Sequence, residues 1–105
     1  MNIEKTFGET IKKLREERSL TLREVAEALN IDTSMLGKIE KNSRKPTKQV
    51  IEKFANLFNV SGKDLTIAFL SDKVAYQVMG EKEFAIEVLK IAEEKVQYLK
   101  TTKTS

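Results

Sequence analysis

Residues that begin and end helices divide the first part of the chain into short segments. Thr6 with Glu9, and Thr21 with Glu24, each have the spacing of a capping box, in which a hydroxyl and a carboxylate satisfy the first backbone N–H groups of a helix. Asn30 tolerates the left-handed backbone conformation that ends many helices. Because starts and stops follow one another so closely, the chain is predicted to fold into a series of short helices.

Apolar residues recur at helical spacing within each segment, and no strand-like alternation interrupts them. The pattern predicts helices over about 6–18, from Thr21 to Asn30, from Asp32 to about Asn42, after Pro46 and from Ser61. The expected core residues occupy the inward positions of these helices: Phe7, Ile11, Leu14, Val25, Ala26, Leu29, Leu36, Ile39, Val50, Ile51, Phe54, Ala55, Leu57, Phe58, Leu65, Ala68 and Phe69.

The composition excludes several classes of function. The 105 residues include no Cys and no His, which rules out disulfides, thiolate or imidazole metal sites and Ser-His or Cys-His catalytic pairs. Every carboxylate is explained by a helix cap or a solvated helix face, and no Gly-rich phosphate loop is present. We therefore expect no enzyme activity and no metal or other cofactor, and no small-molecule effector is evident. Neither a signal peptide nor a membrane-spanning run is found, which predicts a cytoplasmic protein without a membrane partner.

The positive charge of the chain is concentrated in one short stretch. Residues 1–60 hold 12 Lys and Arg against 9 Asp and Glu, whereas residues 61–105 hold 7 of each, so the net +3 arises in the first part. Five basic residues lie between Lys38 and Lys48, against the single acid Glu40. Such a cluster is often only a solvated face, but it also fits an anionic partner.

Two short helices joined by three or four residues are typical of a helix-turn-helix. The second helix, which begins after Asp32, would enter the major groove of DNA with its first residues leading. There Thr33 and Ser34 are able to hydrogen-bond base edges, and Lys38 can reach guanine O6 or N7. The alternative is that Thr33 and Ser34 are ordinary residues of a helix start.

Gly37 lies in the middle of this helix, where glycine costs about 1 kcal/mol relative to alanine. Its missing side chain either lets the helix approach the DNA backbone or a thymine methyl group, or lets it pack against another helix. The following segment offers cations and backbone amides to phosphates, contacts that position a protein on DNA without selecting sequence. The predicted phosphate-contacting residues here are Lys41, Asn42, Ser43, Arg44 and Lys45.

The stretch "LTLREVAEALNIDTSMLGKIEKNSRKP" resembles the DNA-binding core of the phage repressor and Cro family, also called the XRE family. The resemblance extends over about residues 7–69. It implies that Thr33, Ser34 and Lys38 contact bases, with Met35 as an adjacent candidate. It also implies phosphate contacts from the segment 43–45.

Two further features follow from the resemblance. Arg15 and Glu40 fall where the family often has a semi-buried ion pair between the first and third helices, although they can also be independent surface charges. The family usually has Gln as the first residue of the second helix, and this chain has Leu22. The phosphate contact of that Gln is then either lost or made by Thr21 or Arg23.

The longest helix is predicted over residues 81–100, after a separate short segment from Ser71 to Met79 that Gly80 ends. Its apolar residues form two adjacent stripes, which are Phe84, Val88, Ile91 and Tyr98, and Ala85, Leu89, Ala92, Val96 and Leu99. This face is wider than a helix needs for docking on its own domain, which indicates a partner surface. The predicted dimer interface comprises Val88, Leu89, Ala92, Val96 and Leu99. Alternatively, two helices of the same chain cover the face.

These observations predict an all-α protein with a five-helix, repressor-like helix-turn-helix domain over 1–70 and a C-terminal helical dimerisation extension over 71–105. The expected function is that of a homodimeric, sequence-specific regulator that binds double-stranded DNA at a pseudo-palindromic operator. The segment after Phe69 resembles short regulators encoded beside DNA restriction and modification enzymes. The alternative is an antitoxin or adaptor whose C-terminal helices bind another protein, with DNA binding secondary.

Overall fold

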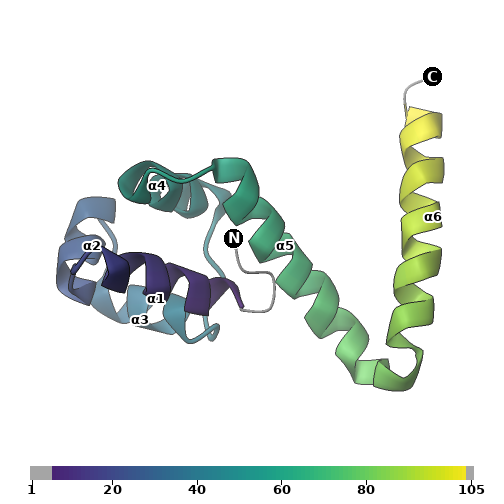
Figure 1. The fold of residues 1–105 in the computed structure, drawn as a ribbon, viewed down its shortest axis with the longest axis horizontal. Coiled ribbons are helices and arrows are strands. Elements are labelled where there is room, and N and C mark those ends of the chain that lie inside the picture. Colours follow the sequence, from purple (N-terminus) through teal and green to yellow (C-terminus); the bar gives the residue numbers. More distant parts are fainter. Residues whose placement is uncertain (1–5, 104–105) are drawn as a thin grey trace. The chain divides into compact units, whose positions relative to one another are not determined.

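A computed structural model describes residues 6–103, and every regular element within that range is a helix. The elements are α1 (Phe7–Glu17), α2 (Leu22–Leu29), α3 (Thr33–Glu40), α4 (Lys48–Phe58), α5 (Gly62–Val78), the 3-10 helix η1 (Met79–Phe84) and α6 (Ala85–Lys103) (Figure 1). The predicted all-α fold is confirmed. The chain divides into two compact units, one ending at Asp72 and the other beginning at Lys73.

The helix starts predicted from the capping boxes are present in the structure. Thr6 and Thr21 are the N-caps of α1 and α2, and each accepts a hydrogen bond from the backbone N–H of the glutamate three residues later. In return Glu24 accepts a hydrogen bond from the N–H of Thr21 at 2.9 Å. This bond is the main reason that the pKa of Glu24 is lowered, and the hydrogen bond with the Thr21 hydroxyl is the second reason. Asn30 ends α2 in the left-handed conformation, with φ 56° and ψ 49°.

The core of the first unit is formed by apolar side chains from all five of its helices. The buried residues are Phe7, Ile11, Val25, Ala26, Leu29, Leu36, Ile39, Val50, Ile51, Phe54, Ala55, Phe58 and Leu65. The other predicted core residues, Leu14, Leu57, Ala68 and Phe69, are partly buried against this cluster. Phe7 joins α1 to α4 and α5, because its ring packs edge-on against Phe54 and Phe69 at 6.4 and 5.5 Å between centroids.

The first turn of α1 is attached to two distant parts of the same unit. The N–H of Phe7 donates to Oδ2 of Asp72 at 2.6 Å, and the N–H of Gly8 donates to Oδ1 of Asn42 at 2.9 Å. The side-chain amide of Asn42 also donates to the Thr6 hydroxyl at 2.8 Å. Because the first N–H groups of a helix have no partner within the helix, these contacts satisfy groups that would otherwise need water.

Gly8 allows α1 to lie directly against the end of α3. A Cβ atom at this position would lie 2.6 Å from the carbonyl oxygen of Ile39 and 2.7 Å from Oδ1 of Asn42, and it would also collide with the carbonyl oxygen of Glu40. Two of these three atoms belong to the backbone, which cannot move aside by a side-chain rotation. The close approach of the two helices therefore depends on glycine.

The helices after Phe69 differ from the prediction in their limits. Residues 71–79 do not form a separate segment, because α5 continues without interruption to Val78. Ser71 does not end the helix; its hydroxyl donates back to the carbonyl of Ala68 at 3.0 Å, a bond compatible with helical backbone. The break comes in η1, where Glu81 has the non-helical angles φ −128° and ψ 57°. Consequently α6 begins at Ala85 and not at residue 81.

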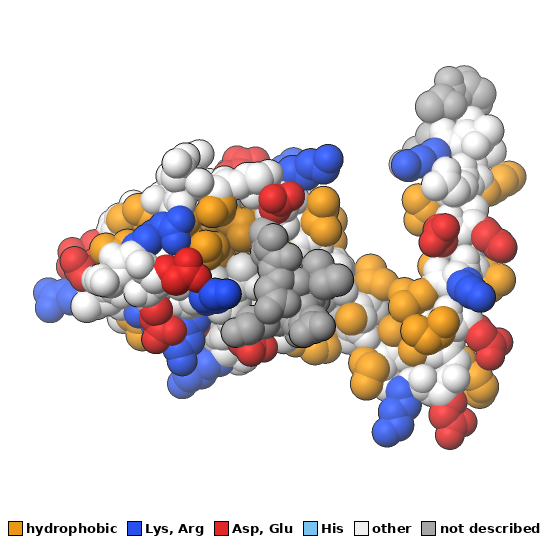
Figure 2. Space-filling model, viewed as in Figure 1, with side chains coloured by type: hydrophobic (Ala, Val, Ile, Leu, Met, Phe, Trp, Pro, Cys, Tyr) orange, Lys and Arg blue, Asp and Glu red, His pale blue; other side chains and the backbone are white. Residues whose placement is uncertain are grey.

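In the second unit, η1 packs against α6, and most apolar side chains of α6 remain exposed. Orange side chains are visible along this helix in Figure 2. None of the helices in the described range has the length and hydropathy needed to cross a membrane.

We predict that Gly8→Ala destabilises the first unit by about 1–3 kcal/mol, the usual cost of inserting a group into a packed site. Gly62→Ala is the matched control, because its Cβ would make an ordinary contact of 3.8 Å with the Cβ of Ala55. The control should be neutral or slightly stabilising. Urea unfolding followed by circular dichroism measures both variants, and equal stabilities would show that α1 and α3 do not need this close approach.

Candidate nucleic-acid interface

The segment between α2 and α3 is a tight turn fixed from both sides. Asn30 ends α2 in the left-handed conformation, and Asp32 is the N-cap residue of α3, although its side chain makes no capping hydrogen bond. Between them the N–H of Ile31 donates to the carbonyl of Ala26 at 3.0 Å. Two helices joined in this way, with both packed on one core, form a helix-turn-helix.

Burial of one face of α3 leaves the opposite face to solvent. Leu36 and Ile39 are fully buried, and the helical period of 3.6 residues places Thr33, Ser34 and Lys38 away from them, where all three are exposed. Their side chains make no hydrogen bond or ion pair within the described part of the chain. Two hydroxyl groups and an ammonium group are thus available to an external ligand.

Met35 and Gly37 occupy different positions on α3. Met35 is only partly exposed, because its side chain packs against the core at the edge of the exposed face. A Cβ at Gly37 would meet none of the described residues within 4 Å, so packing among them does not require a glycine here. Within the described part of the first unit, no other helix therefore packs against the side-chain position of Gly37.

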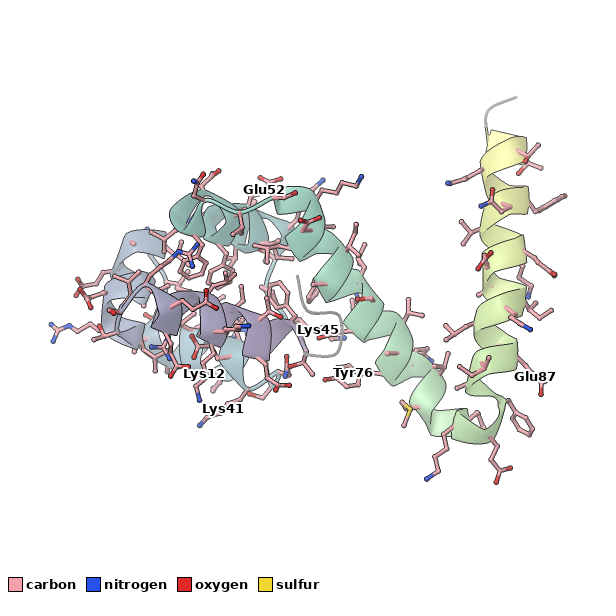
Figure 3. All side chains as sticks on the ribbon, viewed as in Figure 1. Lys12, Lys41, Lys45, Glu52, Tyr76 and Glu87 are labelled. Atoms are coloured by element: carbon pink, nitrogen blue, oxygen red, sulfur yellow. The ribbon has the colours of Figure 1, made fainter. Side chains whose placement is uncertain are left out.

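The segment after α3 is held in a compact turn that presents its cations. The carbonyl of Lys38 accepts hydrogen bonds from the backbone N–H groups of Ser43 and Arg44 at 2.9 and 3.3 Å, and from the Ser43 hydroxyl at 3.2 Å. Lys41, Arg44 and Lys45 are exposed, and the described residues offer them no acidic partner within ion-pair distance. Lys41 projects outward from the surface of the unit (Figure 3).

Asn42 belongs to this segment but has a different environment from its neighbours. Its backbone is left-handed, with φ 62°, and its side-chain oxygen and nitrogen are both bonded to the first turn of α1. The side chain predicted to contact a phosphate is thus already occupied by an internal contact. The sequence showed the helix-ending property of Asn42, but its partners are 34 and 36 residues away, and no local pattern indicates them.

α2 packs against α3, and its first residues include the position where the XRE pattern usually has Gln. Leu22, which replaces the usual Gln of the XRE pattern, packs against the core and offers no polar group. The Thr21 hydroxyl accepts the cap bond from Glu24. Arg23 is exposed and pairs with Glu27, one helical turn further along α2, at 3.2 Å. Because this ion pair is solvated and weak, a DNA phosphate can replace Glu27 with little loss of free energy.

Arg15 and Glu40 join α1 to the end of α3. The guanidinium Nε and one terminal nitrogen donate to the two carboxylate oxygens of Glu40 at 2.8 and 3.0 Å, and the other terminal nitrogen donates to the carbonyl of Leu20 at 2.9 Å. The two side chains are only 12% and 6% exposed. The hydrogen bond to Glu40, opposed by burial, raises the pKa of Arg15.

This geometry agrees with a comparison of the sequence with protein families. A helix-turn-helix family profile matches residues 11–65, a range that covers more than half of the chain and includes α2, the turn and α3. The chain belongs to this helix-turn-helix family, of the XRE type. The predicted family membership is confirmed.

Curated relatives of this helix-turn-helix protein are similar to it over the same region. The HTH-type transcriptional regulator SutR of Escherichia coli is 37% identical over 59 residues, which are 56% of this chain and 33% of SutR. ImmR of Bacillus subtilis is 36% identical over 56 residues, 53% of this chain and 44% of ImmR. YazB of Bacillus subtilis, an uncharacterized HTH-type regulator, is 34% identical over 59 residues, 56% of this chain and 86% of YazB. The match thus spans less than half of SutR or ImmR.

Two solved structures share the fold. The clp gene regulator ClgR from Corynebacterium glutamicum has a TM-score of 0.56 at 18% identity, with 88% of this chain and 95% of that chain covered, which shows the fold alone. A complex of SinR protein with SinI protein has a TM-score of 0.54 at 27% identity, with 95% and 100% of the two chains covered.

We predict that the Arg15–Glu40 pair is strongly coupled in the stability of this helix-turn-helix unit. Removal of either partner leaves the other charge buried and unpaired, so Arg15→Ala and Glu40→Ala should each cost about 3–5 kcal/mol. The double variant should cost clearly less than the sum of the single variants. Denaturant unfolding of all four proteins gives the coupling energy, and a value near zero would mean that the two charges act independently.

Proposed function

We propose that this helix-turn-helix protein is a sequence-specific DNA-binding regulator of transcription that acts as a homodimer on a pseudo-palindromic operator. The observation that carries the proposal is the surface of α3 and the segment after it. An exposed helix face with available hydroxyl and ammonium groups is followed at once by three exposed cations that have no acidic partner among the described residues. The first set suits base edges, and the second suits phosphates.

Base contacts come from the face of α3 that the core leaves exposed. An α-helix fits the major groove, where each base pair presents a distinct pattern of donors, acceptors and methyl groups. Thr33 and Ser34 lie in the first turn, which approaches the bases in a helix-turn-helix. Lys38 lies one turn further along and suits guanine. Met35 contributes at most its exposed edge, because the rest of its side chain packs on the core.

Phosphate contacts come from the turn after α3 and from the start of α2. Lys41, Arg44 and Lys45 supply positive charge beside the α3 face, and Arg23 supplies it from the preceding helix. The backbone of the turn is held by the bonds to the Lys38 carbonyl, so these cations extend from a fixed support. A phosphate-binding surface needs such support, because the fixed positions of its cations set the register of the protein on DNA.

Homodimerisation is proposed for the C-terminal extension, residues 71–105, and DNA binding for residues 1–70. Val88, Leu89, Val96 and Leu99 on α6 are 36–54% exposed although they are apolar, and Ala92 lies among them. A monomer rarely exposes so continuous an apolar surface. A second copy would bury the same stripe from both sides, as a two-fold contact requires, and would place two α3 helices on the half-sites of a palindrome.

A second candidate function is that of an adaptor or antitoxin whose α6 binds a different protein. The solved complex of SinR protein with SinI protein favours this possibility, because a protein of similar fold there binds another chain. The same exposed stripe of α6 would then contact the partner. The oligomeric state of the purified chain separates the two candidates, since a tight homodimer supports the first, and a stable complex formed only with another protein supports the second.

We predict different losses from two sets of α3 and loop variants. Lys38→Ala should cost about 1–3 kcal/mol at the preferred operator and relax selectivity at one or two positions. Arg44→Ala and Lys45→Ala should weaken binding to all DNA sequences about equally, and each should lower the salt dependence by about one unit. Titrations with matched and scrambled DNA at several salt concentrations measure both effects. An unchanged selectivity in Lys38→Ala would remove it from the base-contacting set.

We predict that Leu89→Asp combined with Val96→Asp yields a folded monomer. Each buried Val or Leu contributes about 1.5–3 kcal/mol to an interface, and a buried aspartate opposes association further. Lys90→Asp with Gln97→Asp is the matched control, because helical spacing places these residues away from the apolar stripe. Light scattering should show a monomer for the first variant and a dimer for the control. A dimer in both would place the interface elsewhere, with the exposed α5 residues Ile67, Leu70 and Val74 as the next candidates.

A further inference from the structure

Gly37 is an exception among the glycines of the first unit, because it lies inside a helix, where glycine is unfavourable, and no described residue requires a glycine there. At Gly8 a side chain would collide with backbone carbonyls, and at Gly62 it would make an ordinary contact with Ala55. At Gly37 it would enter open space, and the backbone has ordinary helical angles with no positive φ. Neither packing nor conformation therefore accounts for the residue.

The folding equilibrium would favour almost any other residue at this position. Glycine in the interior of a helix lowers the folding equilibrium constant about fivefold relative to alanine, which is the factor that corresponds to its helix propensity. The position lies in the middle of a helix of only eight residues, which is too short to be stable by itself. Glycine at this position lowers helix stability and makes no compensating contact among the described residues, which points to a contact with another molecule.

The location of Gly37 on α3 identifies the contact. It lies one turn after Thr33 and Ser34 and adjoins Lys38, within the face proposed to enter the major groove. On a helix surface, residues three and four positions apart are neighbours. The missing side chain therefore leaves open space above the Cα of Gly37, next to the positions of Thr33 and Ser34 on the helix surface.

We propose that Gly37 determines part of the DNA specificity, by admitting the C5-methyl group of a thymine to the open space next to Thr33. This inference rests on the proposed DNA-binding function. The thymine methyl is the one apolar group that base pairs present in the major groove, and it is met by apolar atoms such as a threonine methyl. The Cα of Gly37 and the methyl of Thr33 supply such atoms. A Cβ at residue 37 would occupy the space that the methyl needs.

The test compares wild-type protein, Gly37→Ala and the control Gly62→Ala on an operator selected from random DNA by the wild type. Each thymine of the operator is replaced in turn by uracil, which removes only the methyl group. At one thymine of each half-site the wild type should lose about fourfold in affinity, the factor that corresponds to one buried methyl group. Gly37→Ala should bind the thymine operator more weakly than the wild type, and uracil at that position should restore part of its affinity.

Gly37→Ala should at the same time melt about 4–8 °C higher than the wild type, as expected from helix propensity at a solvent-exposed position. A gain in stability together with a loss of DNA affinity distinguishes a DNA contact from a structural role. The control Gly62→Ala should bind every operator as the wild type does. The inference is wrong if Gly37→Ala binds the operator as the wild type does. It is also wrong if there is no thymine at which uracil weakens binding of the wild type and strengthens binding of Gly37→Ala. Failure of the wild type to select any DNA sequence would instead refute the proposed function.

Discussion

The attachment of α1 to the end of α3 is the contact on which the geometry of the first unit depends. It has two parts, at different positions along α1. Near the start of the helix, Gly8 lies against the last carbonyls of α3 and donates its N–H to Asn42. Two turns later, Arg15 binds both oxygens of Glu40. A helix held at two points cannot swing about either one, so the orientation of α3 relative to α1 is fixed.

This attachment explains how the short helix that carries the proposed DNA surface keeps a defined position. α3 has eight residues, and an isolated helix of that length is not stable in water. It is held instead by Leu36 and Ile39 in the core and by the ion pair at its end. Asn42 and Glu40 use their polar groups for this internal purpose, which leaves the neighbouring cations Lys41, Arg44 and Lys45 to face solvent.

The sequence was informative wherever the deciding interaction is local. Capping boxes, the left-handed Asn30 and the apolar period are properties of a few adjacent residues, and the structure has all of them. The bonds from α1 to Asn42 and Asp72 join residues 34 and 65 positions apart, and no local pattern reveals them. The continuity of α5 was missed for a related reason, since the hydroxyl of Ser71 is compatible with either a helix start or a bond back to the preceding turn.

The exposed stripe of α6 has a consequence for how the proposed regulator would respond to its own concentration. A single helix-turn-helix covers half a palindromic site, and two copies combine their binding energies only when they are joined. If dimers form through α6 in the concentration range of the free protein, the dimer concentration, and with it operator occupancy at low protein, rises with the square of the protomer concentration. This dependence would require a dimer that dissociates at low concentration, as an interface confined to a few residues such as Leu89 and Val96 would allow. A large core-like interface would remove it, because the protein would then be dimeric at every concentration.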